Sequence, residues 1–137
     1  MKRMIIALLI AALLAVTVPA MAAGGLVEVI MIYEDYDGNR VEQTEVGEDA
    51  LKEISQILLR SRNNEATLEN CTMNCSLFCK RDDGEIYDFA VATDGCPYIT
   101  DLQTNKTYRL SDSDLEKLWE YFDLVRDVMG YDAAEFF

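Results

Sequence analysis

Residues 75–91 read CSLFCKRDDGEIYDFAV, and this stretch decides how the chain folds. Two runs of alternating apolar residues flank Asp82-Asp83-Gly84, which has the composition of a three-residue hairpin loop. A left-handed conformation at Gly84 would align the two runs so that their apolar residues share one side of a sheet. The predicted pairs are Cys79 with Tyr87, Leu77 with Phe89 and Cys75 with Val91.

A second hairpin is predicted upstream of this one. Leu26 to Asp35 (LVEVIMIYED) is rich in β-branched and aromatic residues, and Asp37-Gly38 then gives a turn signal. Arg40 to Val46 alternates as expected for a return strand with one solvent-facing side. Further along the chain, Asp94-Gly95 separates more β-rich runs, so the sheet is expected to continue as an antiparallel meander.

Two amphipathic helices are predicted beside these strands. Asp49 to Ser61 (DALKEISQILLRS) carries apolar residues at helical spacing. Ser111 with Asp114 forms an acidic variant of the capping box, and Gly130 can close the helix that begins there. The apolar stripe of this second helix is Leu115, Leu118, Trp119, Phe122, Val125 and Met129. The fold class is therefore α+β: an antiparallel sheet of about five to six strands in the order ββα-ββββ-α, with two helices packed on one face.

The first 22 residues, MKRMIIALLIAALLAVTVPAMA, have the pattern of a cleavable signal peptide. Lys2 and Arg3 precede a long apolar run, and the small residues Ala20 and Ala22 suit signal peptidase, so cleavage is expected after Ala22. The alternative is a retained membrane anchor, because the apolar run is nearly long enough to span a bilayer. Residues 23–137 are expected to form one small secreted or extracytoplasmic domain.

The charge of the chain narrows the classes of partner. Because the leader holds two basic and no acidic residues, the mature chain would carry ten basic against 25 acidic residues, a net charge of −15. Such a surface repels the phosphates of nucleic acid and anionic lipid headgroups, so neither nucleic acid nor, after cleavage, a membrane is an expected partner. A basic protein or peptide is the expected partner class, although an acidic surface also simply keeps an exported protein soluble.

Four cysteines could form a metal site, a redox centre, a disulfide or part of the core. On a straight strand Cys71, Cys75 and Cys79 share one face but lie about 13 Å apart, too far to bridge one another or to bind one metal ion. Cys96 is therefore the partner for a disulfide, with Cys71 as first choice and Cys75 as second. A bridge to Cys71 requires a bend before regular strand pairing begins. Cys75 and Cys79 are expected to be buried free thiols.

No catalytic constellation is recognisable, and the protein is predicted not to be an enzyme. The chain contains no histidine, which removes the usual general base and the commonest metal ligand. Aligning Gly38 or Gly84 with the glycine of an EF-hand loop places the wrong residues at both ends of the loop. No metal and no cofactor are expected, and no CxxC pair supports thioredoxin-like chemistry.

The predicted function is that of an exported, non-enzymatic binding domain. Candidate partner contacts are the aromatic residues Tyr33 and Tyr36 beside Asp35 and Asp37, with the terminal residues 131–137 (YDAAEFF) as a second candidate. The alternative is a thiol-dependent redox or metal-handling exported protein, which depends on the cysteines alone. A hydrolase that uses paired carboxylates has no identifiable pair to support it.

The expected cleavage after Ala22 can be tested directly. Mass spectrometry of the protein released by its native host should find an N-terminus at Ala23, because Ala20 and Ala22 satisfy the two narrow subsites of signal peptidase. A full-length chain recovered from the membrane fraction would contradict cleavage and favour the anchor.

Overall fold

Seven antiparallel strands form one sheet in the structure, a computed structural model that describes residues 25–68 and 70–130. The predicted leader and residues 131–137 lie outside the described residues. The strands are β1 (Leu26–Glu34), β2 (Arg40–Glu45), β3 (Glu65–Ala66), β4 (Cys75–Arg81), β5 (Ile86–Val91), β6 (Tyr98–Asp101) and β7 (Lys106–Arg109). Their order across the sheet is β2-β1-β4-β5-β6-β7-β3.

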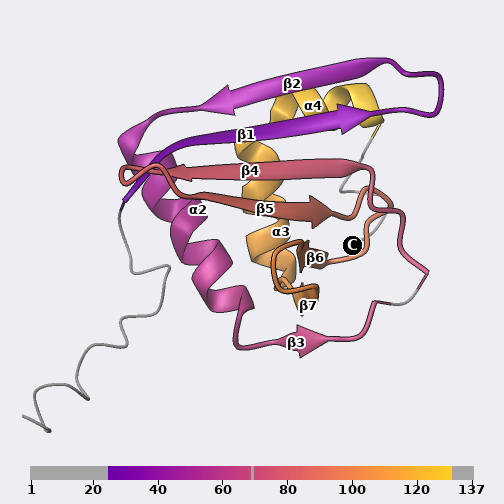
Figure 1. The fold of residues 1–137 in the computed structure, drawn as a ribbon. Coiled ribbons are helices and arrows are strands. Elements are labelled where there is room, and N and C mark those ends of the chain that lie inside the picture. The colour runs from indigo at the N-terminus through magenta and orange to yellow at the C-terminus, as the bar shows by residue number, and fades with distance from the viewer. Residues whose placement is uncertain (1–24, 69, 131–137) are drawn as a thin grey trace, which may run out of the picture.

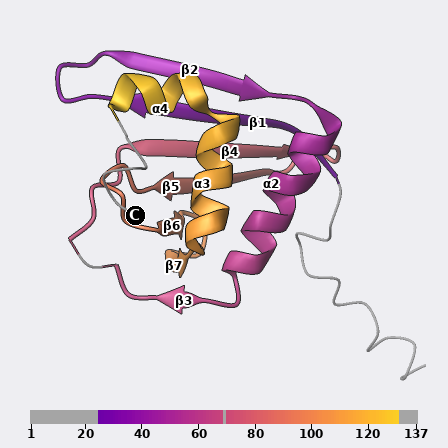
Figure 2. The same ribbon diagram turned by 180° about the vertical axis from the view of Figure 1, so that it is seen from behind.

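Three helices within the described residues cover the same face of this sheet: α2 (Glu48–Ser61), α3 (Asp112–Tyr121) and α4 (Asp123–Met129). Figure 1 shows the sheet in front of the helices, and Figure 2 shows the helices in front of the sheet. The predicted α+β class, with its helices on one face, is confirmed.

The β4–β5 hairpin has the register predicted from the sequence. Cys79 pairs with Tyr87, Leu77 with Phe89 and Cys75 with Val91. Gly84 has a φ of +87°, in the left-handed region that a side chain would strain. All six residues of these pairs are buried, so this hairpin supplies the centre of the apolar face against which the helices pack.

Two details of the predicted fold are wrong. The sheet has seven strands rather than five or six, because Glu65 and Ala66 pair with β7 at the far edge. The last helix is also not continuous: α3 ends at Tyr121, and Phe122 takes a non-helical conformation (φ −121°, ψ 48°) before α4 begins. The apolar stripe nevertheless continues across this break, since Phe122 and Val125 are both fully buried.

Both ends of the α3–α4 unit are formed as predicted. The Ser111 hydroxyl accepts a hydrogen bond from the Asp114 backbone N–H, and Gly130 closes α4 in the left-handed conformation. Trp119, the largest residue of the stripe, is 1% exposed.

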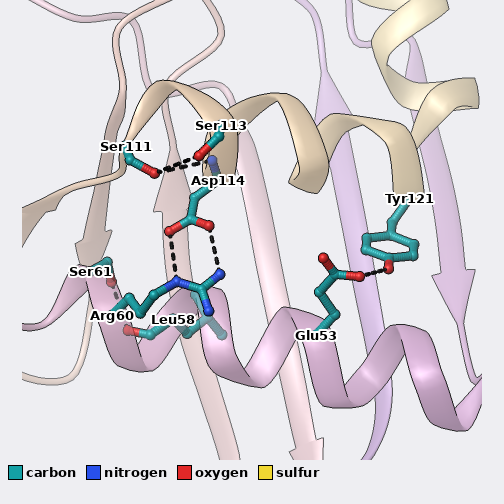
Figure 3. Close-up of polar contacts among 8 residues, drawn as sticks. All are labelled: Glu53, Leu58, Arg60, Ser61, Ser111, Ser113, Asp114 and Tyr121. Atoms are coloured by element: carbon teal, nitrogen blue, oxygen red, sulfur yellow. Dashed lines mark hydrogen bonds and ion pairs between the residues drawn. The ribbon is translucent and has the colours of Figure 1, made fainter.

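Polar contacts hold α2 against α3 along their solvent-facing sides (Figure 3). The Arg60 guanidinium makes two hydrogen bonds to the Asp114 carboxylate, at 2.6 and 3.1 Å. At the other end of the pair, the hydroxyl of Tyr121, the last residue of α3, donates to the carboxylate of Glu53 in α2. The two contacts fix the α2–α3 pair at both ends while the apolar stripes face the sheet.

The break at Phe122 is bridged by one side chain from the sheet, Gln43 of β2. Its Nε2 donates to the Tyr121 carbonyl (3.2 Å) and to Asp123 (3.0 Å). Its Oε1 accepts from the backbone N–H groups of Leu124 (3.0 Å) and Val125 (3.3 Å). Gln43 therefore caps the start of α4 from 80 residues away in the sequence.

Replacing this cap should destabilise the protein. Gln43→Ala leaves the Val125 N–H without its acceptor and leaves the Leu124 N–H with the Asp123 carboxylate alone. It should lower the free energy of unfolding by about 1 to 2 kcal/mol. Urea titration followed by tryptophan fluorescence measures this change. The control is Gln56→Ala, which removes an exposed glutamine of α2 and should change stability by less than about 0.5 kcal/mol. Equal stability of the two variants would contradict the capping role.

Candidate functional site

The loop between β1 and β2 is held in shape by one carboxylate. Asp35 Oδ1 accepts hydrogen bonds from the backbone N–H groups of Asp37 (2.9 Å) and Asn39 (2.8 Å), and Oδ2 accepts from the Asn39 side chain (2.8 Å). The backbone closes the same turn, because the Asp35 N–H donates to Asn39 and the Gly38 N–H donates to Asp35. The hydrogen bonds from Asn39, first of all that of its side chain, lower the pKa of Asp35, so this carboxylate stays ionised and the turn stays closed at neutral pH.

Tyr36 stands at the tip of this closed loop and is 91% exposed. Asp37 beside it is also exposed. Figures 1 and 2 show the loop reaching past the ends of the neighbouring strands. An aromatic ring on a fixed loop can be buried by a partner with little loss of backbone entropy, which is a property of binding hot spots.

Tyr33 does not join this exposed group. It lies on the same side of β1 as the buried residues Val29 and Met31, is half-buried, and packs against the core. The four candidate residues therefore divide by role: Tyr36 and Asp37 are accessible, Asp35 shapes the loop, and Tyr33 anchors the end of the strand. Alternation along the strand could have separated Tyr33 from Tyr36, because Tyr33 has the same parity as the two core residues.

The first-choice disulfide is present, between Cys71 and Cys96, with Cα atoms 6.1 Å apart. Regular pairing of β4 starts only at Cys75, so Cys71 lies in the preceding loop, where the chain bends as the sequence argument required. The Asp94 carboxylate accepts from the Thr72 N–H (2.7 Å), which ties the two bridged loops together. In the chain-entropy treatment a bridge across 25 residues stabilises the fold by about 3 to 4 kcal/mol.

Cys75 and Cys79 are free thiols in the core. Both point toward the helices, and Cys75 Sγ lies 3.4 Å from the sulfur of Met129. Burial raises the pKa of each thiol to about 12. They are therefore protonated and unreactive at neutral pH, as small apolar residues of the core are.

One group of side chains within the described residues has the spacing of a metal site. The ligand atoms of Cys71, Asp94 and Cys96 lie within 4.8 Å of one another. The two sulfurs are joined in the disulfide, however, and both oxygens of Asp94 accept backbone hydrogen bonds. A cysteine binds a metal ion as a thiolate, so Cys71 and Cys96 cannot serve as ligands while the bridge between them is intact.

Among the surface hollows that the described residues line are an apolar one and a polar one. The first, of about 460 Å³, lies between the start of β1 and α2, and Leu26, Val46 and Leu51 supply most of its apolar wall. This hollow was not predicted from the sequence, although the exposed valines Val27, near the start of β1, and Val46, just after β2, are a signal that could have indicated it.

The second hollow, of about 470 Å³, lies beside the start of α3 and is polar. Arg60 and Arg109 are the cations in its lining, and Figure 3 shows that Arg60 is already engaged by Asp114. Ser61 in its wall donates to the Leu58 carbonyl. The Arg60 and Ser61 side chains are therefore occupied within the protein.

No protein-family model, curated protein or solved structure matches this chain. None of the helices in residues 25–68 and 70–130 is long and apolar enough to cross a membrane. The arguments about function therefore depend on the geometry of the chain itself.

The thiols give a prediction with a direct readout. With about one thiol in ten thousand ionised at pH 8, the folded protein should react with iodoacetamide at neither Cys75 nor Cys79 over hours. In denaturant without reductant two adducts should form, and with reductant four, as counted by mass spectrometry. Tyr36→Cys supplies the control, an exposed thiol that should label within minutes. Rapid labelling of Cys79 in the folded wild-type protein would contradict the structural role.

Proposed function

We propose that this protein is exported and acts without catalysis, by binding a basic protein or peptide through the loop between β1 and β2. The observation that carries the proposal is the exposure of Tyr36 on a loop that Asp35 holds closed. A solvated aromatic ring contributes nothing to folding stability, and it would add a large apolar contact to an interface.

Charge supports a basic partner. Glu34, at the end of β1, and Asp37, within the loop, are both exposed. The nearby cation Arg40 lies 3.3 Å from the carboxylate of Glu42. The loop therefore offers a tyrosine among unneutralised carboxylates. A lysine or arginine side chain can pair with the carboxylates and stack on the ring at the same time.

Export is supported by the disulfide. Bridges persist in oxidising compartments and are uncommon in the reducing cytosol, so the Cys71–Cys96 bond is consistent with an extracytoplasmic location. The alternative function, thiol-dependent redox or metal handling, would have to reduce this half-buried bond, since the two remaining thiols are buried and protonated. Binding through the loop requires no such step.

The test compares the secreted protein with a loop variant, Tyr36→Ala/Asp37→Asn. The wild-type protein, immobilised and exposed to the proteins outside its native host, should retain basic proteins that elute with salt. The loop variant should lose them, because it lacks both the ring and one charge. The control Leu102→Ala/Glu116→Gln removes an exposed apolar group and one charge elsewhere and should retain them. Equal capture by the loop variant, or capture of acidic proteins, would contradict the proposal.

A further inference from the structure

The sheet ends at β2 with an unpaired edge. β2 pairs with β1 over its whole length, from Glu45 opposite Val29 to Arg40 opposite Glu34, with no shift in register. In the part of the chain that the structure describes, no strand lies on the other side of β2. Alternate backbone N–H and C=O groups along β2 therefore point to solvent, where a further strand could pair with them.

Of the features by which edge strands usually avoid such pairing, β2 has charged side chains but none that blocks the backbone. β2 contains neither proline nor a bulge, and its six residues match the length of an ordinary strand. The opposite edge of the sheet, β3, is only two residues long. Of the two edges, β2 is the one that can accept a strand.

Carboxylates line the β2 edge on both faces of the sheet. Glu34 and Glu42 lie on the outer face of the sheet. Glu45 lies on the helix face, where Gln43 also binds Asp123 of α4. Two cations lie near these four carboxylates: Arg40, which pairs with Glu42 at 3.3 Å, and Arg126, which interacts with Asp123. Glu45 Oε1 accepts from the Val46 and Gly47 N–H groups, at 3.0 and 2.7 Å. A strand added here would place its side chains beside these groups, so lysine and arginine would be favoured and acidic residues disfavoured.

A second copy of the chain fits this edge poorly. Two-fold pairing of β2 with itself centred on Glu42 sets two carboxylates opposite each other. The register that sets Arg40 opposite Glu42 overlaps only Arg40–Glu42, three of the six residues. The register centred on Gln43 pairs Glu42 with Thr44 and Val41 with Glu45, so it matches no cation with a carboxylate. Each chain also has a net charge of −13. Charge complementarity thus favours a basic partner over self-association.

We infer that the free edge of β2 binds an extended, basic segment of the partner by adding it to the sheet as a further strand. The inference rests on the proposed function and specifies how that partner is held. Backbone hydrogen bonds supply affinity, and alternation supplies specificity: a cation beside Glu42 on the outer face, and an apolar residue beside half-buried Val41 on the helix face. Since β2 begins one residue after Asn39, the strand and the Tyr36 loop form one continuous surface.

The probe is a blocked peptide of three Lys-Val repeats, compared with the same peptide methylated at every backbone nitrogen. Both have the same charge, but the methylated peptide cannot donate backbone hydrogen bonds. Titration calorimetry at low salt should show binding of the first and at least tenfold weaker binding of the second. Hydrogen exchange of the wild-type protein should slow at residues 40–45 when the first peptide is added and stay unchanged at residues 65–66.

A pair of charge reversals completes the test. Glu42→Lys should weaken binding of the unmethylated peptide about tenfold, since an attraction becomes a repulsion. Glu65→Lys, at the opposite edge, makes the same charge change at a glutamate with the same kind of exposed ion pair, 3.3 Å long, and should leave binding within twofold.

Three outcomes would overturn the inference: equal binding of both peptides, unchanged exchange in β2, or equal effects of the two reversals. If the Tyr36→Ala/Asp37→Asn variant still loses the host partner in any of these cases, the proposed function stands and only strand addition fails. If β2 exchange slows with protein concentration and sedimentation shows a dimer, the edge pairs with a second copy instead.

Discussion

The fold depends on one register, that of the β4–β5 hairpin. Gly84 permits a left-handed turn, and the turn sets Cys75, Leu77 and Cys79 on the same face as Tyr87, Phe89 and Val91. A slip of either strand by one residue would send its three apolar residues to the opposite face, and would turn Asp88 of β5 or Lys80 of β4 toward the helices. Since α2, α3 and α4 bury their apolar stripes on this face, the packing of the helices depends on the left-handed conformation of Gly84.

Local signals made most of this arrangement predictable from the sequence. The turn glycines, the Ser111 cap and the apolar stripes each act over a few residues, and the bend at Cys71 follows from disulfide geometry. What the sequence did not reveal depends on distant contacts. The break at Phe122 is stabilised by Gln43 from another element, and β3 is a two-residue strand, Glu65–Ala66, without strand propensity of its own. At the candidate site, composition identified the Tyr36 loop. Excluding Tyr33 from the exposed residues required knowing which side of β1 it occupies.

The four cysteines serve two purposes, and position decides which. Cys71 and Cys96 lie in loops that the meander brings together but that no strand pairing connects. The covalent bond there reinforces a backbone hydrogen bond from the Thr93 N–H to the Thr72 carbonyl, 2.8 Å long. Cys75 and Cys79 lie on the buried side of β4, with Leu77 between them, and fill the core as small apolar side chains. The raised pKa of both thiols keeps them from exchanging with the disulfide next to them in the sequence.

The acidic surface gives the proposed interface its selectivity. A regular edge strand is a hazard in any protein, because any chain with free backbone groups can pair with it. At β2 the carboxylates of Glu42 and Glu45 make self-pairing and pairing with other acidic chains unfavourable, while leaving the edge open to a basic strand. Pro or a bulge would have closed the edge to every partner. Charge alone protects β2 without removing its hydrogen-bonding groups, so the same residues that prevent aggregation would select the partner.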